Sequence, residues 1–266
     1  MNGIAPSKPK DRPTARDRAI AVRSLSADDP ARLIRSLSRY LSDRSPQVRS
    51  TAVDKIRDEK LVGLEGEVLS LLLDKKSYVR YSAVECLGIL HEDEGIQANW
   101  LYPLLADSDY MTRIEALESL AQIGDKSALP LISKLLKDDE PLVRAYAATA
   151  IEDLDGEEHA GAIRRAMKRE TDDRAKVGLA GALFYFGDAN QFSLLLTLLT
   201  SSVYTTRCAA ANTIRSFDLT PAQLQSAIEA VNYALQNPIY RGDASTMDRV
   251  LKELLLKSEA PSTPNH

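Results

Sequence analysis

One pattern recurs along the chain at an interval of 31 to 33 residues. It consists of an acidic or polar residue, a basic residue six positions later and usually an alanine three positions further on. Such a constant period indicates stacked copies of one supersecondary unit. The basic members are Arg49, Arg80, Arg113, Arg144, Lys176 and Arg207, at successive intervals of 31, 33, 31, 32 and 31 residues.

Each copy contains two apolar segments separated by a short polar break. The second segment has apolar residues at i, i+4 and i+7, for example Ala116, Leu120 and Ile123, which lie on one face of a helix. Gly124 follows where such a helix should end. Runs of β-branched and aromatic residues bounded by hairpin turns are almost absent, so the sequence predicts an all-α fold.

The acidic and basic positions resemble those of the HEAT-repeat family, including the shorter HEAT-like repeats of the PBS-lyase (phycobilin lyase) type. In that family two antiparallel helices form each unit, and a turn Asp and an Arg at the start of the second helix link neighbouring units. The resemblance covers roughly residues 30–217 and implies a right-handed α-α superhelix, a solenoid of about seven helical hairpins. It implies a structural ladder of Asp43, Arg49, Asp74, Arg80, Asp107, Arg113, Asp138, Arg144 and Arg207.

The arginines of this ladder are unfavourably placed for the dipole of the helix that they begin. A carboxylate in reach would compensate them, so we interpret the row as structural rather than as a row of binding arginines. The fifth copy departs from the pattern with Glu170 and Lys176. Lysine cannot form the bidentate fork of arginine, and Gly178 and Gly181 follow in the same helix, so we expect a weaker or bent joint there.

We expect the solenoid to span residues 14–257, beginning with a capping helix over 14–26. The flanking residues 1–13, which are basic, and 258–266 are rich in Pro, Ser, Lys and Asn, and we expect both tails to be disordered. The predicted helical pairs cover residues 30–60, 61–92, 95–124, 126–156, 158–187, 189–217 and 220–257.

Composition limits the classes of partner. The formal net charge of −4 disfavours nucleic-acid binding, which needs a basic stripe, and suits a protein partner with a basic surface. No secretory signal or membrane-spanning run is visible, so we expect a cytoplasmic protein, with an organelle transit peptide as the alternative. We interpret Cys86 and Cys208 as small buried hydrophobic residues rather than a disulfide or metal pair.

The sequence offers no constellation typical of an enzyme. Only three histidines are present, and the pairs His91-Glu92 and Glu158-His159 supply too few ligands for the di-iron centre of HEAT-like deoxyhypusine hydroxylases. There is no Gly-x-Ser-x-Gly elbow or phosphate-binding glycine loop, and a single tryptophan with acidic charge disfavours a base glycosylase. We therefore predict no catalytic, cofactor or metal site.

The second helices of such an array line its concave face, and their positions relative to the ladder arginine predict an acidic groove with tyrosines. The bland alternative is that these are ordinary solvated helix residues. A second candidate surface is the turn edge, where Tyr78, Tyr110 and Tyr204 recur, or pack between units. The candidate partner-binding residues of the groove are Tyr81, Glu85, Glu115, Glu118, Tyr146 and Glu152.

The predicted function is a non-enzymatic scaffold or adaptor, favoured as a monomer, whose groove steers and holds a basic protein segment. One alternative is an immunity-type inhibitor that neutralises a basic protein toxin. A second alternative, permitted by the shorter-repeat resemblance, is phycobilin lyase-like handling of a chromophore.

Overall fold

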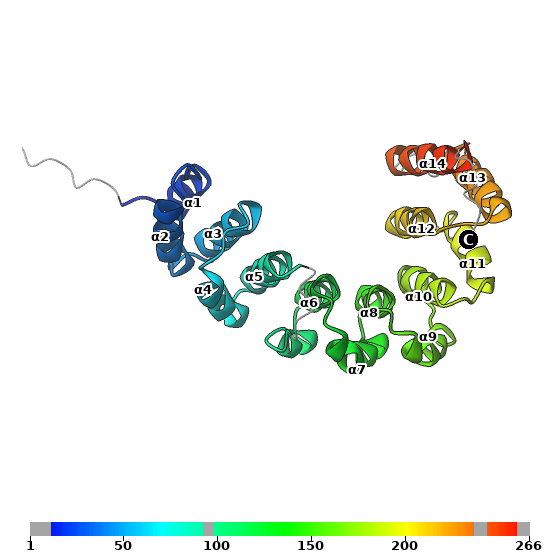
Figure 1. The fold of residues 1–266 in the computed structure, drawn as a ribbon, viewed down its shortest axis with the longest axis horizontal. Helices are drawn as coiled ribbons and strands as arrows, with labels where there is room; N and C mark the ends of the chain where they lie inside the picture. Colours follow the sequence, from blue (N-terminus) through cyan, green and yellow to red (C-terminus); the bar gives the residue numbers. More distant parts are fainter. Residues whose placement is uncertain (1–11, 93–97, 237–243, 260–266) are drawn as a thin grey trace, which may run out of the picture. The chain divides into compact units, whose positions relative to one another are not determined.

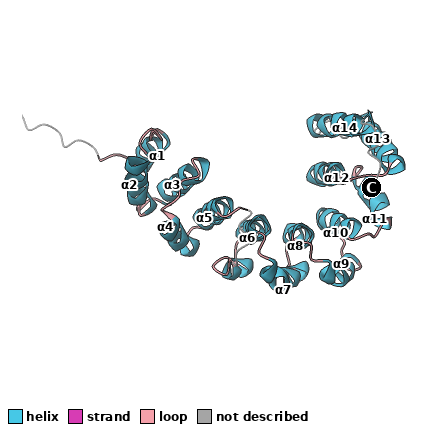
Figure 2. Ribbon diagram, viewed as in Figure 1, coloured by secondary structure: helices cyan, strands magenta, loops and turns pink. Residues whose placement is uncertain are grey.

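The computed structural model describes residues 12–92, 98–236 and 244–259. Every regular element in these ranges is a helix, and no strand occurs in them (Figure 2). The all-α fold class is therefore confirmed. Most of residues 1–13 and of 258–266, the two expected tails, lies outside the described residues. The chain divides into two compact units, residues 1–94 and 95–266, which we call the N-terminal and C-terminal units.

In the N-terminal unit two rows of helices pack on each other (Figure 1). One row is α1, α3 and α5, and the other is α2 and α4. The side chain of Thr14 caps α1 in a capping box with Asp17, and Asp29 caps α2 ahead of a proline. The elements are α1 (Ala15–Arg23), α2 (Pro30–Leu41), α3 (Pro46–Asp58), α4 (Glu65–Ser70), η1 (Leu71–Leu73) and α5 (Ser77–Leu90).

The C-terminal unit repeats this arrangement (Figure 1). Its inner row, α6, α8, α10, α12 and α14, lies on the inside of the curve of this unit, and its outer row holds the other elements. The elements are η2 (Tyr102–Ala106), α6 (Tyr110–Ile123), η3 (Lys126–Ala128), α7 (Leu129–Ile132), η4 (Ser133–Lys137), α8 (Pro141–Asp153), η5 (Glu157–His159), α9 (Ala160–Met167), α10 (Asp173–Tyr185), α11 (Asn190–Leu198), α12 (Tyr204–Ser216), α13 (Pro221–Gln236) and α14 (Ala244–Glu259).

The core of each unit lies between its two rows. The apolar stripe expected on α6 is buried: Ala116, Leu120 and Ile123 have no exposed surface. Burial of one such leucine or isoleucine contributes about 1.5–3 kcal/mol, so the periodic stripes drive the stacking. Cys86 is buried and Cys208 is half-buried, and both are free thiols. Full burial of Cys208 was thus a wrong expectation, because one side of α12 at that position reaches solvent.

The pairing of α8 with α10 depends on a glycine. A Cβ atom on Gly178 would lie 2.4 Å from the backbone oxygen of Ala145, far inside van der Waals contact. The absence of a side chain at residue 178 therefore lets α10 lie directly against the backbone of α8. We expected this glycine to loosen the joint, and instead it permits a closer approach.

Among the described residues, no helix is both long and apolar enough to cross a lipid bilayer.

Candidate functional site

The turn edge carries a ladder of charged side chains. Arg49 on α3 donates to both carboxylate oxygens of Asp74, at 2.7 and 2.9 Å, and to the backbone oxygen of Asp43 in its own turn at 2.7 Å. In the C-terminal unit Arg113 donates to Asp138 at 2.7 Å. Each arginine thus reaches a carboxylate 25 residues ahead, which links one helical pair to the next.

The carboxylates of the ladder also hold their own turns. Asp138 accepts from the backbone N–H of Glu140, two residues on, at 2.9 Å. Asp74 accepts in the same way from Lys76, and Asp107 from Asp109, each at 2.9 Å. One carboxylate therefore fixes a turn and binds an arginine, which explains why this position recurs.

Three further arginines of the ladder bond their own turns. Arg80 donates to the backbone oxygen of Asp74 at 2.8 Å, and Arg113 donates to that of Asp107 at 2.7 Å. Arg207 donates to the backbone oxygen of Ser201 at 2.8 Å.

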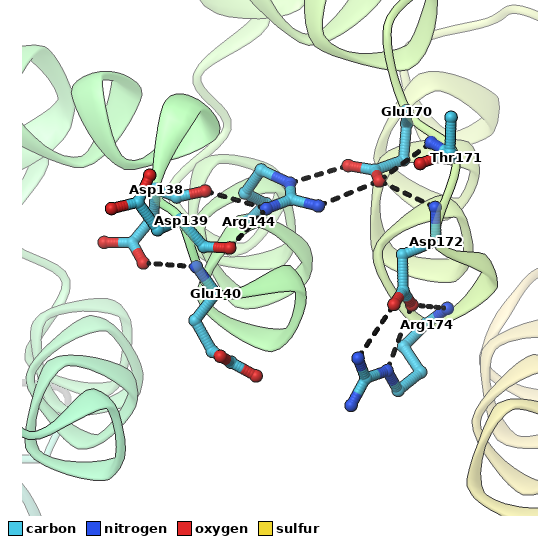
Figure 3. A network of polar contacts seen from close by, with 8 residues as sticks. All are labelled: Asp138, Asp139, Glu140, Arg144, Glu170, Thr171, Asp172 and Arg174. Carbon is cyan, nitrogen blue, oxygen red and sulfur yellow. Dashed lines mark hydrogen bonds and ion pairs between the residues drawn. The ribbon is translucent and has the colours of Figure 1, made fainter.

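The Arg144 joint is as complete as any in the ladder (Figure 3). Arg144 donates to the two carboxylate oxygens of Glu170 at 2.7 and 2.8 Å. Burial of Glu170 opposes its charge, but hydrogen bonds from Arg144 and from two backbone N–H groups outweigh it, so the pKa of Glu170 is lowered. The expectation of a weak joint at Glu170 is wrong, because the longer side chain still reaches the arginine fork.

The next joint does lack the fork. Lys176 pairs with Asp173 on its own helix at 2.9 Å, and the second oxygen of Asp173 accepts from Ser201 at 3.1 Å. A single carboxylate–hydroxyl bond therefore stands where the other joints have a charged fork.

Arg18 extends the ladder and was missed by the sequence reasoning. It donates to the two carboxylate oxygens of Asp43 at 2.7 and 2.8 Å, and this hydrogen bonding holds the pKa of Asp43 below its usual value. Arg18 precedes Arg49 by 31 residues, so the period itself was the signal that could have found it. With their charges engaged in this way, these arginines are structural residues.

The predicted groove residues of the N-terminal unit are partly satisfied within the chain. Tyr81 and Glu85 are half-buried on α5. Glu85 accepts a hydrogen bond from Arg57 on α3, which also pairs with Asp58 at 2.9 Å. Next to them, burial raises the pKa of the Cys86 thiol to about 12, so this cysteine is not a reactive thiolate.

On α6 the predicted groove residues separate. Glu118 is exposed, whereas Glu115 is buried, with 7% of its surface exposed. Tyr146 on the adjacent α8 is half-buried, and burial together with the nearby charges of Glu118 and Glu115 raises its pKa. Glu115 therefore faces the α6–α8 contact, and its assignment as a groove residue is wrong because α8 covers that side of α6.

The carboxyl of Glu152 is the most perturbed acid of the inner row. Burial, and the neighbouring carboxyl of Asp153, raise its pKa to about 7. Desolvation by the surrounding protein also raises the pKa of Asp153. One carboxylate oxygen of Glu152 lies 3.8 Å from the position that a Cβ atom on Gly181 would occupy, so α10 closes over it. Neither Glu152 nor Asp153 forms a side-chain hydrogen bond or ion pair with another described residue.

We call Glu118, Glu152 and Asp153 the acidic face of the inner row. Tyr146 lies beside it, two turns before Asp153 on α8. Asp153 was not among the residues predicted from the sequence, although it follows Glu152 directly.

At its other end the inner row is basic and internally paired. Arg215 on α12 donates to Glu253 on α14 at 2.8 Å, and Arg249 donates to Asn212 at 3.1 Å. Lys257 donates to the backbone oxygen of Arg215 at 2.8 Å. These cations are therefore engaged, in contrast to Glu152.

The turn-edge tyrosines are not packed away. Tyr78, Tyr110 and Tyr204 are 45, 40 and 49% exposed at the starts of α5, α6 and α12. Among the described residues no group of three or more His, Cys, Asp or Glu side chains is arranged to hold a metal ion. His159 lies 3.9 Å from its neighbour Glu158.

The paired rows and their ladder define a helical-repeat protein of the solenoid class. Residues 98–183 match the family model described as HEAT repeats, and the resemblance to HEAT repeats is thereby confirmed.

One chain from the complex of CpcE and CpcF of phycocyanin lyase from Nostoc sp. PCC7120 has a similar fold. The TM-score is 0.57 at 16% sequence identity, over 87% of this chain and 98% of that chain. At this identity the likeness concerns the fold alone. An engineered protein of known crystal structure aligns over 90% of this chain and 97% of its own at 20% identity, with a TM-score of only 0.36. No curated protein sequence matches this chain.

Proposed function

We propose that this chain is a protein-binding scaffold whose acidic face binds a basic segment of a partner protein. One observation carries the proposal: Glu152 is a half-buried carboxyl whose pKa is raised to about 7 and which has no cationic partner among the described residues. A carboxyl held in this state gains most from a cation that arrives from outside.

A lysine or arginine of the partner would lower the pKa of Glu152 and convert it to the carboxylate. Two unit charges about 4 Å apart near a protein surface attract by roughly 4 kcal/mol before desolvation is counted. Tyr146 offers the partner a half-buried ring beside these charges, and tyrosine is enriched among residues that dominate binding energy. Charge and ring together suit a basic segment with an apolar neighbour.

The class of fold supports this proposal. HEAT repeats present extended surfaces, and such folds suggest protein interaction. The Nostoc chain of similar fold is itself part of a complex of two proteins, CpcE and CpcF.

The test compares the acidic face with a matched set of carboxyls. The variant is Glu118→Gln, Glu152→Gln and Asp153→Asn, and the control is Glu157→Gln, Glu158→Gln and Glu229→Gln, three exposed carboxyls away from the inner row. Both remove three negative charges. Glu85 is left unchanged because Arg57 already neutralises it.

Each protein is used for affinity purification from cells of the source, followed by mass spectrometry. The proposal expects a basic protein in stoichiometric amount with the wild type and the control but not with the acidic-face variant. It also expects the wild type to bind more tightly as pH rises through about 7, because Glu152 then ionises without the partner's help. Undiminished binding by the variant would overturn the proposal.

The partner's identity separates the finer versions of the function. A toxin inhibited in one-to-one association would make the chain an immunity-type inhibitor. A coloured tetrapyrrole retained equally by all three proteins would favour chromophore handling, for which the phycocyanin lyase likeness is the support.

A further inference from the structure

A cluster of cations lies on the outer row of the C-terminal unit, away from the acidic face. Lys134 and Lys137 on η4 and Arg165 and Arg169 on α9 line one hollow of about 370 Å³. All four side chains are exposed, and we call them the basic patch. Arg164 and Lys168 add two further exposed cations on α9.

The basic patch has no counter-charge within the described chain. None of its four side chains forms an ion pair or hydrogen bond with another described residue. Asp138 and Glu170 lie at its border, since they line an adjoining hollow with Lys137 and Arg169. Both carboxylates are already bound by the ladder arginines, Asp138 at 2.7 Å and Glu170 at 2.7 Å.

This arrangement is unusual in a chain of net charge −4. Other cations of the chain, such as Arg18, Arg57 and Arg215, are paired with carboxylates. Four like charges around one hollow repel one another, and an anionic partner would relieve that repulsion. We propose that the basic patch is a second docking surface, which binds an acidic segment of a protein.

The surroundings of the patch favour an acidic protein segment over a nucleic acid. The basic track does not continue along the outer row, because neither α7 nor α11 contains a lysine or arginine. A phosphate backbone needs a longer stripe of cations. No aromatic side chain lines the hollow, so single-stranded bases have nothing on which to stack. Arginine forks match the carboxylates of Asp and Glu side chains.

This inference goes beyond the proposed function and does not depend on it. The acidic face and the basic patch lie on opposite rows of one unit, so the unit can hold two partners of opposite charge at the same time. The chain would then act as a bridge between a basic and an acidic protein.

The test measures binding of a fluorescein-labelled deca-glutamate peptide by fluorescence anisotropy at about 50 mM salt. The patch variant carries Lys134→Glu, Arg165→Glu and Arg169→Glu. The control carries Lys75→Glu, Lys76→Glu and Lys252→Glu, which change the net charge equally at exposed, scattered positions. Thermal unfolding of all three proteins verifies that they fold.

We expect the patch variant to bind the peptide roughly tenfold more weakly than the wild type, and the control to stay within about twofold. The acidic-face variant should bind the peptide at least as well as the wild type, which separates this test from that of the proposed function. Absence of saturable binding by the wild type, an equal loss in both charge-reversed proteins, or tighter patch-dependent binding of a short DNA duplex would each overturn the proposal.

Discussion

Glu85 and Glu152 are two inner-side acids with opposite surroundings. Glu85 on α5 of the N-terminal unit accepts a hydrogen bond from Arg57 on the neighbouring α3. Glu152 on α8 of the C-terminal unit meets no cation among the described residues, and α10 opposes it with Gly181. The chain thus compensates one acid internally and leaves the other to an external charge.

This difference shows that an acidic residue at a groove position is not by itself a binding residue. A carboxylate that is already paired has little to gain from a partner, because the partner must first displace the internal cation. The comparison therefore locates binding in the C-terminal unit and assigns Glu85 to stability.

The largest expected effect tests the close α8–α10 contact that shields Glu152. Gly178→Ala places a methyl group 2.4 Å from the Ala145 oxygen, so the helices must separate. We expect a loss of about 3 kcal/mol in the free energy of unfolding, measured by urea denaturation. Separation of the helices should also admit water and bring the pKa of Glu152 back towards its ordinary value.

The matched control is Gly161→Ala on α9. The Cβ atom of this variant would meet only the end of the Arg165 side chain at 3.6 Å. Because alanine favours a helix over glycine, this variant should be unchanged or more stable by up to about 1 kcal/mol. Equal effects of the two variants would show that the close contact is unimportant.

A smaller effect is expected from breaking the internal pair of the comparison. Arg57→Ala leaves Glu85 without its cation, in a setting where neither side chain is fully exposed. We expect destabilisation of about 1–2 kcal/mol, measured as a lower urea midpoint with unchanged slope. Lys60→Ala is the control, since Lys60 is 70% exposed and lies 3.9 Å from Glu92. An unchanged midpoint for Arg57→Ala would remove the distinction between the two units.

The repeating features of the fold were predictable because each copy places the same residue in the same position. The constant period indicated the ladder from Arg49 onward and, extended backwards by one interval, reaches Arg18. The same interval separates Lys134 from Arg165 and nearly that of Lys137 from Arg169, so the basic patch was also within reach of the period.

The contacts between unlike positions were not predictable in this way. The burial of Glu115 depends on α8 covering one side of α6, which the spacing within α6 does not reveal. Likewise the Arg57–Glu85 pair depends on two side chains that occur in one copy only. A period specifies where a residue sits in its own hairpin, whereas the neighbouring copy decides what that residue touches.

The smallest and most discriminating effect is the dependence of stability on pH at Glu152. The pKa of its carboxyl is about 7 in the folded chain against an ordinary value of 4.5, so between these values the unfolded chain ionises while the folded chain keeps its proton. Raising the pH through this window therefore lowers stability, and the loss is complete above about pH 7.

Glu152→Gln removes this loss. The variant should unfold at a higher temperature than the wild type at pH 8, by a margin on the order of 1 kcal/mol after allowance for solvent around a half-buried side chain. The margin should vanish near pH 4, where the carboxyl is protonated in both states. Glu85→Gln should instead lower the midpoint at pH 8, because Arg57 loses its charged partner. The same sign of change for both variants at pH 8 would mean that the two carboxyls are equivalent, and the acidic face would lose its claim to need a partner.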